Sequence, residues 1–122
     1  MTYQIDTFDD QIRIEFNGAL DALDLILLNQ SPAYKTAIEN KKKMLIDFTG
    51  IEGSKLTAED AKGLAMFGQL DSERVKNLHL VIAVEQDSAL AILHICEKVF
   101  SDSSWKVDTV DTLMKAKQLL SQ

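Results

Sequence analysis

Residues 44–48 read MLIDF, and residues 78–84 read LHLVIAV. Each stretch is a short and almost unbroken apolar run, and lysines and Gly50 bound the first one. Such runs are typical of central strands in a parallel sheet, because helices cover both faces of those strands. A helical pattern separates the two runs, which predicts right-handed crossover connections between parallel strands. These two stretches therefore decide the fold class, which we predict to be α/β.

The first 18 residues predict an antiparallel hairpin. Tyr3 and Ile5 lie between polar neighbours, and residues 12–16 (IRIEF) alternate with the period of two that half-buried strands show. Residues 9–10 (DD) supply a turn signal between the two runs. We expect the second strand to end at residues 17–18 (NG), since both residue types tolerate the positive φ of a chain reversal.

Helical patterns occupy most of the remaining chain. Residues 20–30 have leucines at helical spacing, and residues 31–32 (SP) resemble an N-cap followed by a proline at the first helical position, so we expect a broken helix. Thr57 followed by Glu59 and Asp60 predicts a second helix that runs to about residue 72.

The last third of the chain repeats the pattern. We expect a helix over residues 88–100, a short strand over residues 105–107, and a terminal amphipathic helix that is capped by Asp108 or Thr109. The whole order predicts a mixed, mostly parallel five-stranded sheet with an N-terminal antiparallel hairpin and about four helices. No Pro/Gly/Ser-rich linker interrupts it, so we expect residues 1–122 to form a single domain.

Composition narrows the class of function. The chain has 13 basic and 19 acidic side chains and a net charge of −6, which disfavours binding to nucleic acid. Its single cysteine, Cys96, cannot form an internal disulfide, and the N-terminus lacks the features of a signal peptide, so a cytoplasmic location is expected. The longest apolar stretch is too short to cross a membrane.

Motifs of common enzymes are missing from the sequence. It contains no GxGxxG, GxxxxGK[ST] or GxSxG motif. The two histidines, His79 and His94, have no HxxxH or CxxC partner, and Cys96 has apolar neighbours that would keep its thiol unreactive. We therefore predict no catalytic residues, no metal site and no cofactor.

Ser54 and Thr57 lie between the 44–48 strand and the second helix. Free N–H groups and the positive end of the helix dipole stabilise an anion at such a place. Thr57 and Ser54 are therefore candidates for an anion or phosphorylation site. The alternative interpretation of Thr57 is a plain helix N-cap.

Apolar residues are in surplus on the first two helices. Met66 and Leu70, with Phe67 at their edge, lie away from the small-residue side of the second helix, and Leu25 and Leu28 turn away from Leu20, Leu23 and Leu27 on the first. Such a face indicates contact with a partner subunit, a regulatory protein or an apolar ligand. Alternatively, a bent helix buries both of its sides.

The order of elements, the phrase MLIDFTGI at residues 44–51, the loop to Thr57 and the ending WKVDTV at residues 105–110 resemble the STAS domain, specifically its SpoIIAA-like group. The resemblance covers nearly the whole chain. It implies a non-enzymatic regulatory domain that binds a partner protein or forms a homodimer. It also implies that Thr57, and less closely Ser54, corresponds to the phosphorylatable residue of that group. Residues 54–59 (SKLTAE) lack the family's Asp-Ser-Ser-Gly pattern.

Two other functions compete with this interpretation. Relatives in the SpoIIAA-like group have been likened to lipid-binding domains of the CRAL-TRIO type. In that alternative, Leu25, Leu28, Phe67 and Leu70 line a site for a lipid or another apolar ligand between the two helices and the sheet. A third candidate is a hydrolase or isomerase, in which Glu85 and Asp87 would face Thr57 at the carboxyl edge of the strands.

Overall fold

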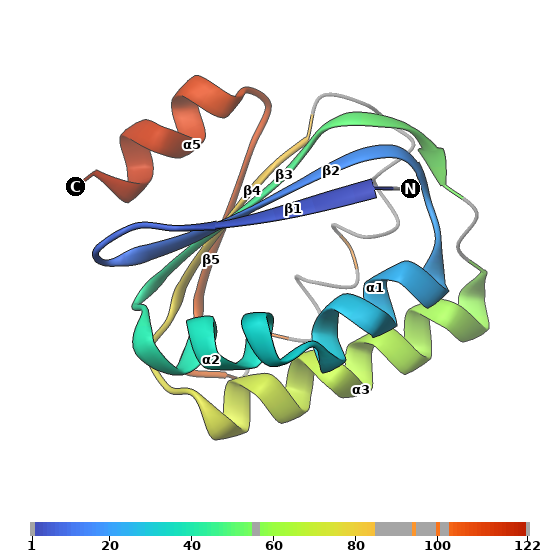
Figure 1. Cartoon of the computed structure of the whole chain (residues 1–122), viewed down its shortest axis with the longest axis horizontal. Coiled ribbons are helices and arrows are strands. Elements are labelled where there is room, and N and C mark those ends of the chain that lie inside the picture. Colours follow the sequence, from blue (N-terminus) through green and yellow to red (C-terminus); the bar gives the residue numbers. More distant parts are fainter. Residues whose placement is uncertain (1, 55–56, 85–93, 95–99, 101–102, 122) are drawn as a thin grey trace.

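The computed structural model describes residues 2–54, 57–84, 94, 100 and 103–121. Five strands form one sheet in the order of the sequence (Figure 1). The first pair is antiparallel and the other pairs are parallel, which confirms the predicted mixed α/β sheet with its N-terminal hairpin. The strands are β1 (Thr2–Thr7), β2 (Gln11–Leu20), β3 (Lys43–Ser54), β4 (His79–Ala83) and β5 (Lys106–Val110).

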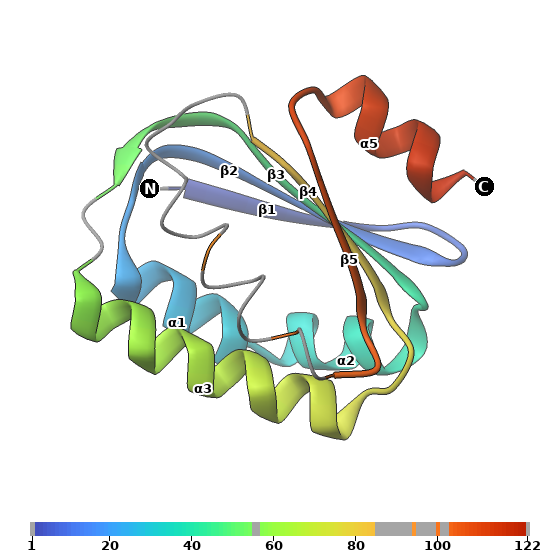
Figure 2. The same cartoon turned by 180° about the vertical axis from the view of Figure 1, so that it is seen from behind.

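The helices of the described residues lie on both faces of this sheet. They are α1 (Ala22–Gln30), α2 (Pro32–Asn40), α3 (Ala58–Arg74) and α5 (Leu113–Leu120). Figures 1 and 2 show α1, α2 and α3 together on one face and α5 alone on the other. The helix predicted over residues 88–100 falls almost entirely outside the described residues.

Each helix starts where a polar side chain accepts a backbone N–H. The caps are Asp21 for α1, Ser31 for α2, Thr57 for α3 and Thr112 for α5. Pro32 directly follows Ser31, and this pair divides the predicted first helix into α1 and α2, as expected from the sequence. Local chemistry therefore fixes these helix starts.

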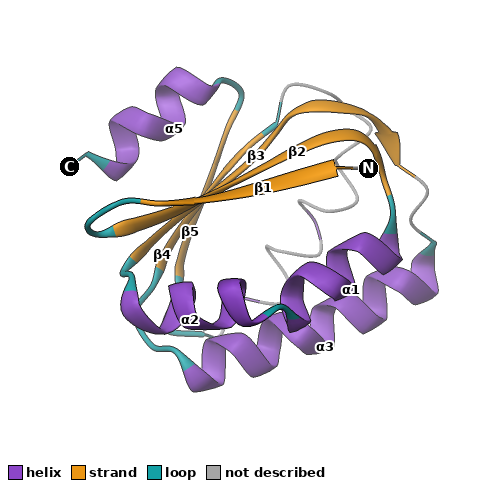
Figure 3. Ribbon diagram, in the orientation of Figure 1, coloured by secondary structure: helices purple, strands orange, loops and turns teal. Residues whose placement is uncertain are grey.

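Two hydrophobic cores result, one on each face of the sheet. Figure 3 shows the helices that cover the two faces. The larger core lies under α1 and α2 and extends to Phe100 and Trp105, whose rings stack with their centroids 4.8 Å apart. The smaller core lies under α5. Its buried members are Leu45, Val81, Ala83, Ala116 and Leu120.

Two strands are longer than the sequence predicted. β2 continues past Gly18 to Leu20, and β3 continues to Ser54, because the two strands pair in parallel over their whole length. The register shifts between Glu15 and Asn17, where a Cβ on Gly50 would overlap the Asn17 side chain. A larger residue at position 50 would force the Asn17 side chain to move and would place its Cβ 3.0 Å from the Phe16 carbonyl oxygen.

The last strand is also longer than the sequence predicted. β5 runs from Lys106 to Val110 alongside β4, so its pairing extends beyond the predicted strand over residues 105–107. Asp108 and Thr109 are therefore strand residues, and Thr112 caps α5 in their place. Among the described residues, no helix is long and apolar enough to cross a membrane.

Candidate functional site

The outer surfaces of α1 and α3 carry large apolar side chains. Leu23 and Leu27 on α1 and Met66 and Leu70 on α3 are each between 55% and 64% exposed. Both pairs have a spacing of four residues, which places the two members of a pair on one side of their helix. Figures 1 and 2 show α1 and α3 side by side over the same face of the sheet. We call these four residues the outer apolar face.

Met66 and Leu70 lie where the sequence placed them, on the outside of α3. The predicted orientation of α1 was wrong. Leu28 is buried in the large core and Leu25 packs against that core, whereas Leu23 is exposed. Residues 20–28, which include most of α1, contain five leucines and one isoleucine. Because these apolar residues lie on several sides of the helix, the sequence pattern does not distinguish an inner side from an outer side.

Charged side chains of both signs lie on the helices that carry the outer apolar face, with carboxylates on both helices and exposed Lys62 and Arg74 on α3. Glu59 and Glu73 are exposed on α3, and Asp24 lies in the first turn of α1. α1 contains no basic residue, and Lys62 is exposed on α3. The excess of carboxylates agrees with the net charge of −6 for the whole chain. This surface therefore combines exposed apolar side chains with a small excess of carboxylates, and it suits a partner with apolar groups and some basic ones.

The start of α3 is closed by a capping box. Thr57 Oγ1 accepts the backbone N–H of Asp60 at 3.1 Å, and Asp60 Oδ2 accepts the backbone N–H of Thr57 at 2.9 Å. The N-cap interpretation of Thr57 is confirmed, and the Thr57 residue is exposed. The Asp60 carboxylate therefore already provides negative charge at this helix end. Ser54 is the last residue of β3 rather than a loop residue, and it pairs with Leu20.

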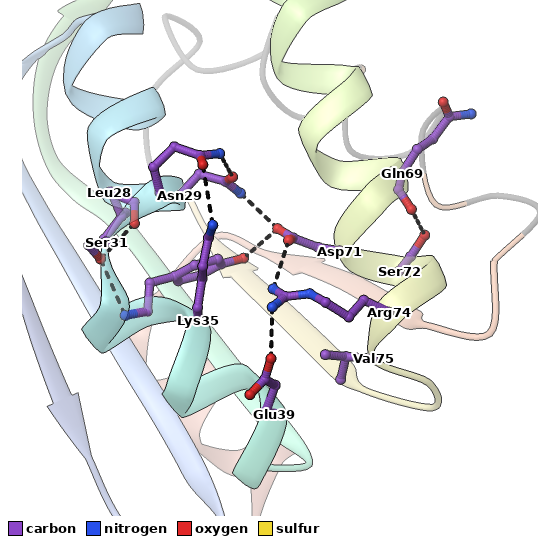
Figure 4. Close-up of polar contacts among 12 residues, drawn as sticks. Leu28, Asn29, Ser31, Lys35, Glu39, Gln69, Asp71, Ser72, Arg74 and Val75 are labelled. Carbon is purple, nitrogen blue, oxygen red and sulfur yellow. Dashed lines mark hydrogen bonds and ion pairs between the residues drawn. The ribbon is translucent and has the colours of Figure 1, made fainter.

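A buried carboxylate joins three helices beneath the outer apolar face (Figure 4). Asp71 of α3 is 6% exposed. Its Oδ2 accepts from Asn29 Nδ2 of α1 at 2.7 Å and from the Tyr34 hydroxyl of α2 at 3.1 Å. Its Oδ1 lies 3.3 Å from Arg74, which also donates to Glu39 of α2 at 2.8 Å.

The sequence analysis missed this cluster, although one signal was present. Asp71 lies four residues after Phe67 and seven after Leu64, so it continues their inward stripe. A carboxylate on such a stripe needs partners, since burying an unpaired charge is costly. The cluster fixes the relative positions of α1, α2 and α3, and thereby of the outer apolar face.

A cavity of about 140 Å³ lies between α1, α3 and the sheet. Leu25, Leu28 and Phe67 line it, but Leu70 is not among the residues that line it. Binding pockets for small molecules usually enclose about 300 Å³ or more. This volume is too small for a fatty-acid chain, so the geometry does not support the lipid-binding alternative.

Several of the remaining residues that the sequence singled out lie outside the described part of the chain. Glu85, Asp87 and Cys96 lie outside the described residues. His79 Nε2 is 2.7 Å from Asp108 Oδ2 on the α5 side of the sheet, and His94 is exposed. Within the described part of the chain, no three His, Cys, Asp or Glu side chains gather in a way that could hold a metal ion.

Comparison with solved structures gives a clear likeness. The structure is similar to that of the anti-sigma factor antagonist SpoIIAA in its unphosphorylated form, with a TM-score of 0.60. The likeness covers 98% of this chain and 97% of that chain at 15% sequence identity. No protein-family model matches the sequence, and no curated protein matches it either. The chain therefore has the SpoIIAA-like fold, as the sequence resemblance implied.

Proposed function

We propose that this chain, which shares its fold with an anti-sigma factor antagonist, is a non-enzymatic regulatory domain that binds a partner protein through the outer apolar face. The observation that carries the proposal is the presence of two exposed apolar pairs, Leu23 with Leu27 and Met66 with Leu70, on two helices that contact each other. Exposed apolar groups of this size mark interaction surfaces when they gather on one face. The small excess of carboxylates on α1 and α3 favours a partner whose contact surface is apolar and carries some basic groups.

The partner contact can be tested by charge substitution on α3. Replacing both Met66 and Leu70 with Asp should abolish capture of a partner from an extract of the protein's own host, because it places two charges at the centre of the contact. Met114→Asp is the matched control, since Met114 is 70% exposed on α5, on the other face of the sheet. Circular dichroism should report the same folded spectrum for all variants.

Two results would refute the proposal. One is a partner that the Met66→Asp/Leu70→Asp variant still retains as strongly as the unchanged chain. The other is a partner that the Met114→Asp control loses as well. In the first case the outer apolar face is not the contact surface, and in the second the loss has no relation to a particular face.

The second part of the proposal concerns Thr57 as a control point. Thr57 is exposed at the start of α3, so a modifying enzyme can reach its hydroxyl. A phosphate on Thr57 would disturb the hydrogen bond that Thr57 Oγ1 accepts from the Asp60 N–H, and the Glu59 and Asp60 carboxylates would repel it. Phosphorylation would therefore loosen the first turn of α3 and weaken partner binding from that end of the face. We regard Ser54 as the secondary acceptor because it lies at the end of β3, before this turn.

Intact-mass measurement of protein isolated from its host tests this part. A phosphate increment that disappears in Thr57→Val but persists in Ser54→Ala would support it. Protein that never carries phosphate under any growth condition would contradict it, without affecting the test of the outer apolar face.

A further inference from the structure

The strand β1 forms an open edge of the sheet. Among the described residues, it lies at one end of the strand order and pairs with β2 alone (Figure 1). Its six residues pair with β2 in an unbroken register, with no bulge. β1 contains no proline, lysine or glycine, and Asp6 is its single charged residue. Natural edge strands usually carry such features to prevent pairing with another strand, so β1 is free to pair.

The hairpin geometry shows which backbone groups face the open side. The Phe8 N–H donates to the Gln11 carbonyl at 2.8 Å, which makes these two residues a hydrogen-bonded pair. Hydrogen-bonded and non-hydrogen-bonded pairs alternate along an antiparallel ladder. Even-numbered residues of β1 therefore bond to β2. Tyr3, Ile5 and Thr7 direct their N–H and C=O groups outward.

This outward set is complementary to itself. When two copies of β1 run antiparallel with Ile5 opposite Ile5, Tyr3 of each copy lies opposite Thr7 of the other. The outward groups then form about six backbone hydrogen bonds between the copies. In the same register Gln4 faces Asp6 of the other copy, so an amide donor meets a carboxylate and no two like charges are opposed.

A hollow beside the strand fits this arrangement. It is lined by Thr7 at the end of β1 and by residues of α2 that include Pro32, Ala33 and Thr36. In the Ile5-centred register the partner's Tyr3 side chain lies on the same face as Thr7. The Tyr3 ring is 39% exposed in the single chain, and the hollow offers it an apolar contact.

We propose that β1 pairs with β1 of a second copy of this chain, which forms a two-fold symmetric dimer with one sheet that continues across both copies. This interface is separate from the outer apolar face, so dimerisation leaves α1 and α3 open to a partner. The dimer does not depend on the regulatory function proposed above.

Sedimentation and amide exchange test the dimer. Analytical ultracentrifugation from low micromolar to submillimolar concentration should show a monomer–dimer equilibrium. Over the same range, the amides of Tyr3, Ile5 and Thr7 should gain protection from hydrogen exchange as the concentration rises. A chain that stays monomeric throughout, or a dimer in which these three amides gain no protection, would overturn the proposal.

Charge at position 4 tests the register. Gln4→Asp places like charges opposite each other twice in the dimer and should raise the dimer Kd about tenfold, whereas Gln4→Lys should lower it. Because Gln4 also faces Glu15 within the chain, urea unfolding must show that both variants remain folded.

Thr7→Pro removes an outward N–H and should also weaken the dimer. Gln118→Asp, an exposed change on α5, is the control. Equal dimer Kd values for all four variants would overturn the proposal.

Discussion

In the described part of the chain, the helices α1, α2 and α3 cover one face of the sheet, and α5 covers part of the other. In the described residues the first face buries 16 core residues, and the second buries 5. The first face also has the Asp71 cluster that joins its three helices. The α5 face is held at its margin by Lys43 Nζ, which donates to the Leu120 carbonyl at 2.6 Å. The comparison indicates that the α1–α3 layer is a rigid platform, and that α5 contributes less to global stability.

The largest expected difference comes from matched core deletions. Ile38 of α2 and Leu120 of α5 are both completely or almost completely buried. Ile38→Ala should lower the free energy of unfolding by about 3 to 4 kcal/mol, and Leu120→Ala by about 2 kcal/mol, since the last turn of a terminal helix can relax around the cavity. Urea unfolding measures both. Equal losses would show that the two layers contribute equally to stability.

Removal of a carboxylate should also cost more stability on the α1–α3 face than on the α5 face. Asp71→Ala leaves Asn29 and Tyr34 without their buried acceptor, so it should cost about 2 to 3 kcal/mol. Asp108→Ala removes the partner of His79, but water reaches this pair, so the loss should be about 1 kcal/mol or less. Thermal unfolding of both variants measures the difference. A greater loss for Asp108→Ala would reverse the comparison.

Helix caps give a smaller contrast. Thr57 takes part in a two-way capping box, whereas Thr112 accepts one N–H, from Lys115 at 3.2 Å. We expect Thr57→Ala to cost about 1 kcal/mol and Thr112→Ala about half as much. Replacement by Ser at each position should restore most of the stability, because the serine hydroxyl can cap in the same way. Failure of Thr57→Ser to restore stability would contradict the capping explanation.

The smallest effect is a pH dependence on the α5 side. The hydrogen bond from Lys115, at 2.8 Å, and its charge hold the pKa of Asp111 below its ordinary value of 3.8. A depressed carboxyl pKa contributes stability above pH 3.8, and this contribution is lost as the pH falls through the folded-state pKa. An NMR titration of Asp111 should therefore show a midpoint below 3.8, and Lys115→Ala should return it toward 3.8. An unchanged midpoint in Lys115→Ala would exclude Lys115 as the cause.

Local sequence signals predicted much of this fold. The Ser31-Pro32 pair and the Thr57 cap act over three or four residues, and each lies where the sequence placed it. The alternation in β1 and β2 likewise predicted the hairpin. These features depend on side chains that contact their own backbone or an adjacent strand, so a single sequence contains their cause.

Features that depend on distant pairing could not be predicted in the same way. β3 continues to Ser54 because β2 lies beside it, and nothing within residues 49–54 indicates this. The orientation of α1 depends on which of its many apolar residues meets α3 and the sheet, so Leu28 and Leu23 exchanged the roles expected of them. Met66 and Leu70 could be predicted because the other side of α3 carries small residues and a clear inner stripe.

The central claim is that the outer apolar face contacts another protein while the α5 face does not. A photo-reactive amino acid placed at position 66 or at position 114, in the protein's own host, tests this claim most directly. We predict a specific cross-linked product with a different protein from position 66 and none from position 114. The opposite pattern, or products from position 66 that contain only a second copy of this chain, would contradict the claim.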